Sequence, residues 1–354
     1  MLDLFKITRP FIHALSPETA HNAALFALSK NLLPAAKVEI NPLLTQNIFG
    51  LEFKNPVGLA AGFDKNAAAV DALLRQGFGF VEAGTVTPRP QDGNPKPRIF
   101  RLSADKAIIN RLGFNNNGLE IFVKNFSKRD KKLGVAGANI GKNKDTADAA
   151  SDFVLGLQAV YPYADYITIN ISSPNTVGLR DLQAKEQLGE LLSQLTTARE
   201  AASKIHQRRV PLLLKIAPDI DGGQREDIAQ TVIKYAIDGL IVSNTTISRP
   251  DILQDAQKSE TGGLSGAPLF ALSTAVLADM YRLTDRKIPI IGVGGVASAE
   301  DAYEKIRAGA SLVQLYSALI YQGFSLVREI NQKLPALLKR DGFSHISEAV
   351  GAKI

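Results

Sequence analysis

The 354-residue sequence predicts an α/β fold, a (β/α)8 TIM barrel with a small N-terminal helical extension. From Val57 onward, short apolar runs alternate with segments of helical spacing, which is the repeat of a parallel sheet. Turn residues such as glycine, asparagine and serine follow the end of each run. Because eight such units occupy roughly 300 residues, we expect a closed barrel. An open doubly wound sheet is the alternative.

The expected strands are short, mostly apolar runs bounded by turn residues. They are 57–60, 80–83, 134–139, 166–170, 212–216, 239–242, 288–292 and 312–315. Helical spacing predicts helices at 147–161, 185–206, 224–236, 269–283 and 299–308. The connection from residue 85 to residue 133 is unusually long and rich in proline, and a connection of that length usually has a function.

We expect residues 1–40 to form an extension that precedes a catalytic barrel domain at 41–354. Phe5, Phe11 and Leu15 contribute to an apolar helical face, and Ser16-Pro17-Glu18 is typical of the start of a second helix. The pair of helices either packs on the barrel as an ordinary cap or lies on a membrane surface. No apolar run approaches the roughly 18 residues that a membrane-spanning helix needs.

Composition narrows the chemistry that the chain can perform. The absence of cysteine excludes disulfides, iron-sulfur clusters and a cysteine nucleophile. The four histidines lie far apart without ligand spacing, so we expect no metal site, and any redox reaction needs an organic cofactor. The net charge of +6 is not concentrated in a basic block, and no nucleic-acid-binding motif is present, so we expect no nucleic-acid partner.

Polar residues follow the ends of all eight expected strands, where TIM-barrel enzymes form their active sites. They include Lys65, Thr85, Asn139, Asn170, Lys215, Ser243, Asn244, Gly295, Tyr316 and Ser317. The glycine turn at 292–295 leads toward a helix, and such a turn either binds phosphate through backbone N–H groups or is a tight turn for steric reasons alone.

Two lysines are candidates for binding an anion at the mouth of the barrel. Lys215 follows an apolar run and would stabilise negative charge on a reduced flavin, or form a Schiff base. Lys65 suits a carboxylate ligand, and the alternative for a lone lysine is a solvated surface residue. Asparagine side chains match the amide edges of a pyrimidine ring; the candidates are Asn110, Asn115, Asn170, Asn175 and Asn244. For Asn116 and Asn117 we expect a role in a turn.

Six motifs together closely resemble the dihydroorotate dehydrogenase family, and the resemblance runs through essentially the whole chain. They are AAGFDK (60–65), NRLGFNNNG (110–118), NIGKNKDT (139–146), NISSPNTVGLR (170–180), SNTT (243–246) and GVGG (292–295). Several long motifs in order are far more specific than any single one.

The resemblance implies the cofactor FMN and oxidation of (S)-dihydroorotate to orotate in de novo pyrimidine biosynthesis. The residues implied to bind FMN are Ala61, Gly62, Phe63, Asp64, Lys65, Thr85, Asn139, Asn170, Lys215, Ser243, Gly266, Gly295, Tyr316 and Ser317. Those implied to contact substrate are Lys65, Asn110, Arg111, Leu112, Gly113, Phe114, Asn170, Asn175, Asn244 and Thr245.

Two features resemble the quinone-dependent class of the family. Ser173 occupies the position where the cytosolic classes have a cysteine base, and a helical extension precedes the barrel. The resemblance implies that Ser173 is the catalytic base and that His21 and Arg101 lie near the quinone head group. It also implies a peripheral membrane protein. Since Met1 begins almost directly on the extension, without an Arg/Ser-rich presequence, we expect the cytoplasmic face of a bacterial inner membrane.

Two other functions compete with this interpretation. One is a phosphate-binding barrel that works as an aldolase through a Schiff base on Lys215. The other is a peripheral membrane-binding module whose barrel is catalytically silent.

Overall fold

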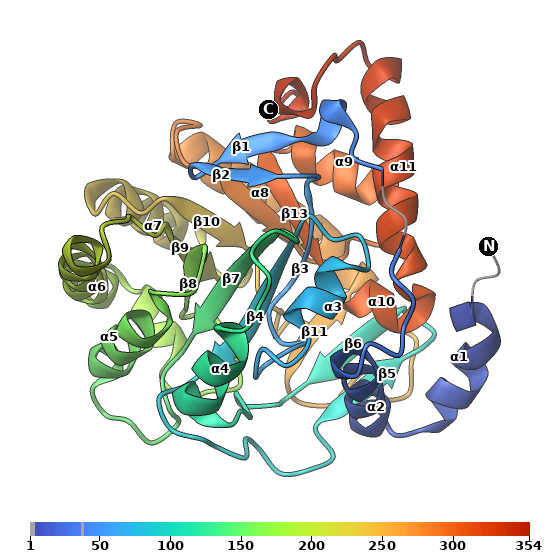
Figure 1. Cartoon of the computed structure of the whole chain (residues 1–354), viewed down its shortest axis with the longest axis horizontal. Helices are drawn as coiled ribbons and strands as arrows, with labels where there is room; N and C mark the ends of the chain where they lie inside the picture. The colour runs from blue at the N-terminus through green and yellow to red at the C-terminus, as the bar shows by residue number, and fades with distance from the viewer. Residues whose placement is uncertain (1–3, 37–38) are drawn as a thin grey trace.

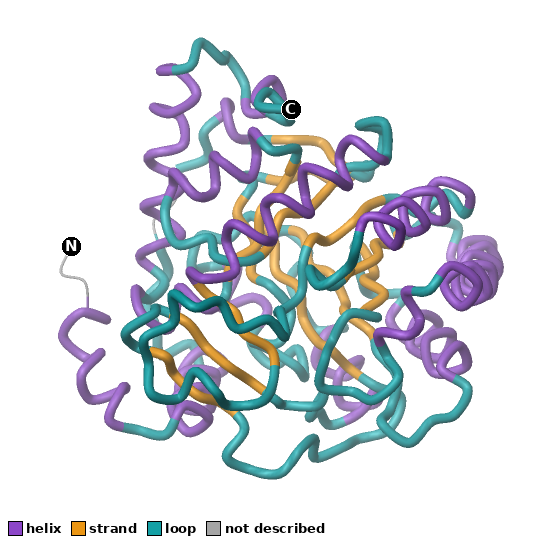
Figure 2. Tube along the Cα trace, turned by 180° about the vertical axis from the view of Figure 1, so that it is seen from behind, coloured by secondary structure: helices purple, strands orange, loops and turns teal. Residues whose placement is uncertain are grey.

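The computed structural model describes residues 4–36 and 39–354, which form a closed barrel surrounded by helices (Figure 1; Figure 2). All strand pairs in the barrel are parallel. Its eight strands are β3 (Val57–Leu59), β4 (Phe80–Val86), β7 (Val135–Ile140), β8 (Tyr166–Asn170), β9 (Leu212–Ile216), β10 (Gly239–Val242), β12 (Ile290–Val293) and β13 (Ala310–Leu315). The (β/α)8 prediction is therefore confirmed, with strand ends shifted by a few residues.

The helices of the barrel are α3 (Val70–Leu74), α4 (Gly118–Phe126), α5 (Ala149–Val160), α6 (Lys185–His206), α7 (Gly222–Lys234), α8 (Phe270–Leu283), α9 (Ala299–Arg307), α10 (Ser317–Gln322) and α11 (Ser325–Arg340). Capping side chains determine where several of these helices begin. Asp148 caps α5, and Ser298 caps α9. Asp221 forms a capping box with Gln224, so α7 begins two residues before the expected start at 224.

Successive side chains of a strand point to opposite faces, so every second residue of a barrel strand points into the barrel. These inward-facing side chains differ between the two ends of the barrel. At the amino-terminal end, Phe53, Phe80 and Tyr166 belong to one buried apolar cluster. The hairpin of β1 (Gln46–Ile48) and β2 (Leu51–Phe53) contributes to this cluster and lies at that end of the barrel (Figure 1). Polar side chains replace the aromatic ones toward the carboxyl ends, where the site forms.

The long connection from residue 85 to residue 133 contains two strands that sequence analysis did not predict. They are β5 (Ile99–Leu102) and β6 (Ala107–Asn110), and β6 also pairs with β11 (Gly263–Gly266) to make a three-stranded antiparallel sheet. The strand β11 has the sequence GLSG, which has no strand pattern of its own. Pairing with a segment about 150 residues away in sequence is what makes it a strand.

The extension consists of α1 (Leu4–Ala14) and α2 (Pro17–Ser29), which lie beside β5 and α10 (Figure 1). Ser16 caps α2 by accepting a hydrogen bond from the backbone N–H of Thr19. Within the expected range 1–40, residues 1–3 and 37–38 lie outside the described residues. None of the described helices is long and apolar enough to cross a membrane.

The barrel interior is packed so closely that glycines on it have no room for a methyl group. A Cβ atom on Gly137 would lie 2.1 Å from Cζ of the buried Tyr166. We therefore expect Gly137→Ala to destabilise the protein by about 1–3 kcal/mol, measured from the midpoint of urea unfolding.

The matched control is Gly222→Ala at the first position of α7, where a Cβ would meet nothing within 4 Å. We expect its midpoint to stay unchanged or to rise slightly. Equal midpoints for the two variants would show that the interior is not close-packed at this layer.

Candidate active site

A cavity of about 840 Å³ opens at the carboxyl ends of the barrel strands and extends to the helices α1 and α2. Its volume lies within the range of pockets that enclose a small organic ligand, about 300–1,000 Å³. Most residues expected to act are among those that line it: His21, Ala61, Gly62, Phe63, Lys65, Thr85, Arg101, Asn110, Leu112, Gly113, Phe114, Asn170, Ser173, Asn175, Lys215, Ser243, Asn244, Thr245, Gly266, Gly295, Tyr316 and Ser317.

A chain of side-chain hydrogen bonds crosses the base of the cavity from strand to strand. The hydroxyl of Thr85 donates to Oδ1 of Asn139 at 2.5 Å. Nδ2 of Asn170 donates to Oγ1 of Thr85 at 2.8 Å and to Oδ1 of Asn139 at 3.2 Å. Nδ2 of Asn244 continues the chain, since it donates to Oδ1 of Asn170 at 3.3 Å. These side chains are therefore held in fixed orientations before any ligand binds.

Lys215 places a buried ammonium group at the same level. It pairs in register with Asn170 on the neighbouring strand, and it lines the cavity with 5% of its surface exposed. Burial lowers the pKa of Lys215, and the nearby carboxylate of Glu82 partly opposes that effect. Within the described residues, no hydrogen bond or ion pair satisfies its ammonium group. A buried cation of this kind favours an anionic or electron-rich ligand.

The second candidate cation, Lys65, is held at the rim of the cavity. Its Nζ donates to the backbone carbonyl of Gly62 at 2.8 Å. The pKa of Lys65 is lowered to about 8, chiefly by burial and next by the guanidinium of Arg98, while Glu18 partly opposes both effects. Lys65 is therefore mostly protonated at neutral pH and available to a carboxylate.

Ser173 and two asparagines meet on one side of the cavity. The backbone N–H of Asn175 donates to Oγ of Ser173 at 3.3 Å. Nδ2 of Asn175 donates to the backbone carbonyl of Asn110 at 3.1 Å. Oγ1 of Thr176 is buried and has no partner within the described residues. The Ser173 hydroxyl thus faces the cavity from a loop whose position is fixed by the 110–118 segment.

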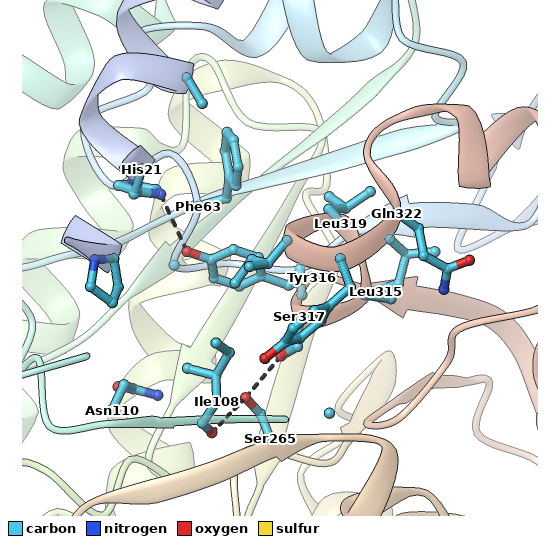
Figure 3. Close-up of a pocket in the computed structure, with 18 of the residues that line it drawn as sticks. His21, Phe63, Ile108, Asn110, Ser265, Leu315, Tyr316, Ser317, Leu319 and Gln322 are labelled. Carbon is cyan, nitrogen blue, oxygen red and sulfur yellow. Dashed lines mark hydrogen bonds between the residues drawn. The ribbon is translucent and has the colours of Figure 1, made fainter. Parts of the chain in front are cut away.

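Glycines with left-handed backbone form another wall. Gly266 and Gly295 have φ angles of 100° and 79°. A Cβ atom on Gly295 would lie 2.5 Å from Cβ of Phe270, so this wall accepts no side chain. Beside it, Oγ of Ser317 donates to Oγ of Ser265 at 2.8 Å (Figure 3). Backbone N–H groups and small hydroxyls in this arrangement are suited to a phosphate group.

The far end of the cavity joins the barrel to the extension. The hydroxyl of Tyr316 lies 3.4 Å from Nδ1 of His21, and the rings of both residues contact Phe63 edge-on (Figure 3). Burial lowers the pKa of His21 to about 3, with Lys65 as the next cause, so His21 is neutral at physiological pH. Arg101 lines the same end and donates to the backbone carbonyls of His13 and Leu15.

Three of the expected site residues, Asp64, Asn139 and Arg111, do not line the cavity. The carboxylate of Asp64 is fully buried and accepts from the backbone N–H groups of Ala68 and Ala69. Asn139 lies one layer deeper, beneath Thr85.

Arg111 points away, toward Glu260, with which it forms an ion pair of 2.7 Å. A further candidate, Asn115, lines a small polar hollow beside Arg98 instead. Asn116, for which a turn was expected, accepts from the backbone N–H of Gly118 at 2.8 Å.

Two residues were not expected from the sequence: Gln314 lines the cavity, and Glu82 lies beneath it. Glu82 accepts hydrogen bonds from Asn139, Tyr166, Thr168 and Gln314. Oε1 of Gln314 is buried and has no partner within the described residues. A charged or amide residue within an otherwise apolar strand, as in FVEAG and ASLVQL, is the signal that could have revealed both. In the described part of the chain, no cluster of His, Asp or Glu is suited to a metal ion.

Comparisons with known proteins identify the family of this chain. The family model described as dihydroorotate dehydrogenase matches residues 43–338. A protein of Azorhizobium caulinodans named dihydroorotate dehydrogenase (quinone) is 52% identical to this chain, with 100% of each chain covered. An Arabidopsis thaliana protein named dihydroorotate dehydrogenase (quinone), mitochondrial, is 49% identical, with 98% of this chain and 81% of that one covered.

A solved structure has the same fold. The crystal structure of DHODH from Eimeria tenella in complex with ferulenol superposes with a TM-score of 0.91 at 44% identity, with 95% of each chain covered. Family model, full-length relatives and structure all converge. The chain therefore belongs to the family of quinone-dependent dihydroorotate dehydrogenases, which are oxidoreductases.

Proposed function

We propose that the protein binds FMN and oxidises (S)-dihydroorotate to orotate, passing the electrons to a membrane quinone in de novo pyrimidine (UMP) biosynthesis. The observation that carries the proposal is the unpaired ammonium of Lys215, buried at the base of a cavity that also has a phosphate-type glycine wall. Both features suit an elongated anionic ligand, and membership of the family supports FMN as that ligand.

The residues present fit FMN at both of its ends. Gly266, Gly295 and Ser317 would hold the phosphate, while Lys215 would face the flavin ring. The unpaired Oε1 of Gln314 is an acceptor that a ring N–H would satisfy. When bound, FMN supplies the acceptor for a hydride from dihydroorotate and, in a separate step, the reductant for the quinone.

Substrate would lie beside Ser173, where the chain offers both charge and hydrogen bonds. Lys65 would bind the substrate carboxylate, and Asn110, Asn175 and Asn244 would contact the amide edges of its ring. Ser173 would remove the proton from C5. Serine is a weak base, and the neighbouring hydroxyl of Thr176, buried and unpaired, is our candidate for the path by which that proton leaves.

The quinone would enter from the other end of the same cavity. Ile12, Ala24 and Ala27 of α1 and α2 give that end an apolar lining, which excludes water. His21 and Arg101 would lie near the quinone head group. Because burial keeps His21 neutral, it would orient the head group by hydrogen bonding and not by charge.

The extension also has apolar side chains that are largely exposed. Phe11 is 75% exposed and Phe26 is 59% exposed, and Leu32, three residues beyond the end of α2, is 65% exposed. Because such residues favour the interface of a bilayer, we propose peripheral association with the cytoplasmic face of a bacterial inner membrane. This position would bring the apolar end of the cavity to the quinone pool.

The decisive experiment is an anaerobic visible spectrum of the purified protein. We expect flavin absorbance, bleaching on addition of dihydroorotate, and recovery on addition of a short-chain ubiquinone. A protein without flavin colour after incubation with FMN, but trapped by borohydride with a carbonyl substrate, would indicate a Lys215 aldolase instead. Flavin colour without bleaching would indicate a catalytically silent barrel.

Replacement of the proposed base tests the substrate half of the reaction. We expect Ser173→Ala to retain FMN and to slow flavin reduction by dihydroorotate about 10²-fold or more, because no group is left to take the C5 proton. Ser173→Cys is the matched variant, since a thiol can still accept a proton, and it should reduce faster than the alanine variant. Near-normal reduction by Ser173→Ala would reject this role; the measurement is stopped-flow absorbance.

Vesicle sedimentation tests the proposed association with a membrane. We expect Phe11→Glu to lose most binding to vesicles that contain anionic lipid, because a charge at that position opposes insertion. Ile205→Glu on α6 is the control, since Ile205 is also 75% exposed but lies outside the extension. If both variants bind vesicles as the unmodified chain does, the extension is an ordinary cap.

A further inference from the structure

The carboxylate of Glu82 accepts four hydrogen bonds inside the barrel. Nδ2 of Asn139 donates to its Oε1 at 2.7 Å. The hydroxyls of Tyr166 and Thr168 and Nε2 of Gln314 each donate to its Oε2 at 3.1 Å. The donors come from β7, β8 and β13, and Glu82 itself is fully buried on β4. A carboxylate has no donor of its own, so every one of these partners must point a hydrogen toward it.

This requirement also determines the orientation of the linked side chains of Asn139, Thr85, Asn170 and Asn244 (the amide chain). Because Asn139 directs its NH2 group to Glu82, only its Oδ1 is left to face Thr85 and Asn170, and both of these donate to it. Asn170 therefore uses its own NH2 group in that direction. Its Oδ1 is left as an acceptor for the hydroxyl of Ser172 at 3.1 Å and for Nδ2 of Asn244. Reversing any one amide would set two donors or two acceptors against each other.

We propose that Glu82 is a positioning residue that sets the direction of this amide chain and thereby the atoms that Asn170 and Asn244 present to a bound ring. Glu82 and Asn139 do not line the cavity, whereas Thr85, Asn170 and Asn244 do. The effect of Glu82 on a ligand therefore passes through Asn139. The inference rests on the proposed function only in taking that ring to be the flavin and its substrate.

The first test is Glu82→Gln, which keeps the shape of the side chain and adds one donor. The new NH2 group either opposes Nδ2 of Asn139 and reverses the amide chain, or opposes Nε2 of Gln314 and turns that amide over. In either case a side chain that lines the cavity changes the atoms that it presents to a bound ring. We expect the variant to bind FMN and to bind orotate at least about tenfold more weakly, because one buried polar group is left unpaired. The measurement is the dissociation constant of orotate from the shift in flavin absorbance.

A second substitution should restore the orotate affinity that Glu82→Gln removes. In the double variant Glu82→Gln/Asn139→Asp the carboxylate moves one step along the chain, where it accepts from the amide at position 82 and from Thr85 and Asn170. The direction of Asn170 is thereby kept. Asn139→Asp alone places two carboxylates side by side, which is unfavourable. We expect each single variant to lose orotate affinity and the double variant to return within about threefold of the unmodified protein.

Tyr166→Phe separates positioning from simple stability. It removes one donor to Glu82 without reversing any amide, so it should lower the unfolding midpoint and leave orotate affinity within about twofold. The inference is overturned if Glu82→Gln binds orotate normally, if the double variant is as weak as the single ones, or if Tyr166→Phe is as weak as Glu82→Gln.

Two further outcomes are also decisive. If neither single variant folds, folding of the double variant supports the inference and its failure to fold overturns it. An unmodified protein that is not bleached by dihydroorotate would contradict the proposed function before any variant is compared, so the two failures can be told apart.

Discussion

Burial imposes one constraint on the interior of the closed barrel, because each polar side chain that is buried there needs a hydrogen-bond partner. Aromatic side chains such as Phe80 and Tyr166 fill the amino-terminal layers. Glu82 marks the change from apolar to polar layers, and its four donors satisfy it completely. Above it, the ammonium of Lys215 and Oε1 of Gln314 are among the groups that have no partner within the described residues, and a ligand would satisfy both.

The cavity is shared between the barrel and the extension, which are joined by directed contacts. Arg98, nearly buried in the long connection, donates to both carboxylate oxygens of Glu18 on α2 at 2.6 and 3.2 Å. The same guanidinium donates to the backbone carbonyls of Asp92 and Asn94. The pKa of Glu18 is lowered chiefly by its hydrogen bond with Arg98. These bonds join α2, the helix that carries His21, to the loop that contains Asn94. Nδ2 of Asn94 in turn donates to the backbone carbonyl of Asn175, so the loop contacts both ends of the cavity.

Much of the fold could be predicted because it depends on local pattern. The eight barrel strands are confirmed, since buried parallel strands are short apolar runs and each is followed by turn residues. The five expected barrel helices were predicted within a few residues for the same reason, whereas α3, α4, α10 and α11 were not among the expected helices. The sheet of β5, β6 and β11 was missed because its pairing joins residues near 108 and 265, and no local pattern in GLSG announces it. The roles of individual site residues stay predictions, although most of the expected residues do line one cavity.

The sequence by itself determined the family, the barrel and the set of polar residues at the strand ends, because periodicity and ordered motifs are properties of the chain alone. Only the tertiary structure decided which of those residues face the cavity. Asp64 and Asn139 carry the same motif signal as Lys65 and Asn170, yet one closes a turn and the other lies beneath the cavity floor. The depth of a side chain within the barrel follows from strand register and from packing across the interior, and neither can be read from the neighbours of a residue in sequence.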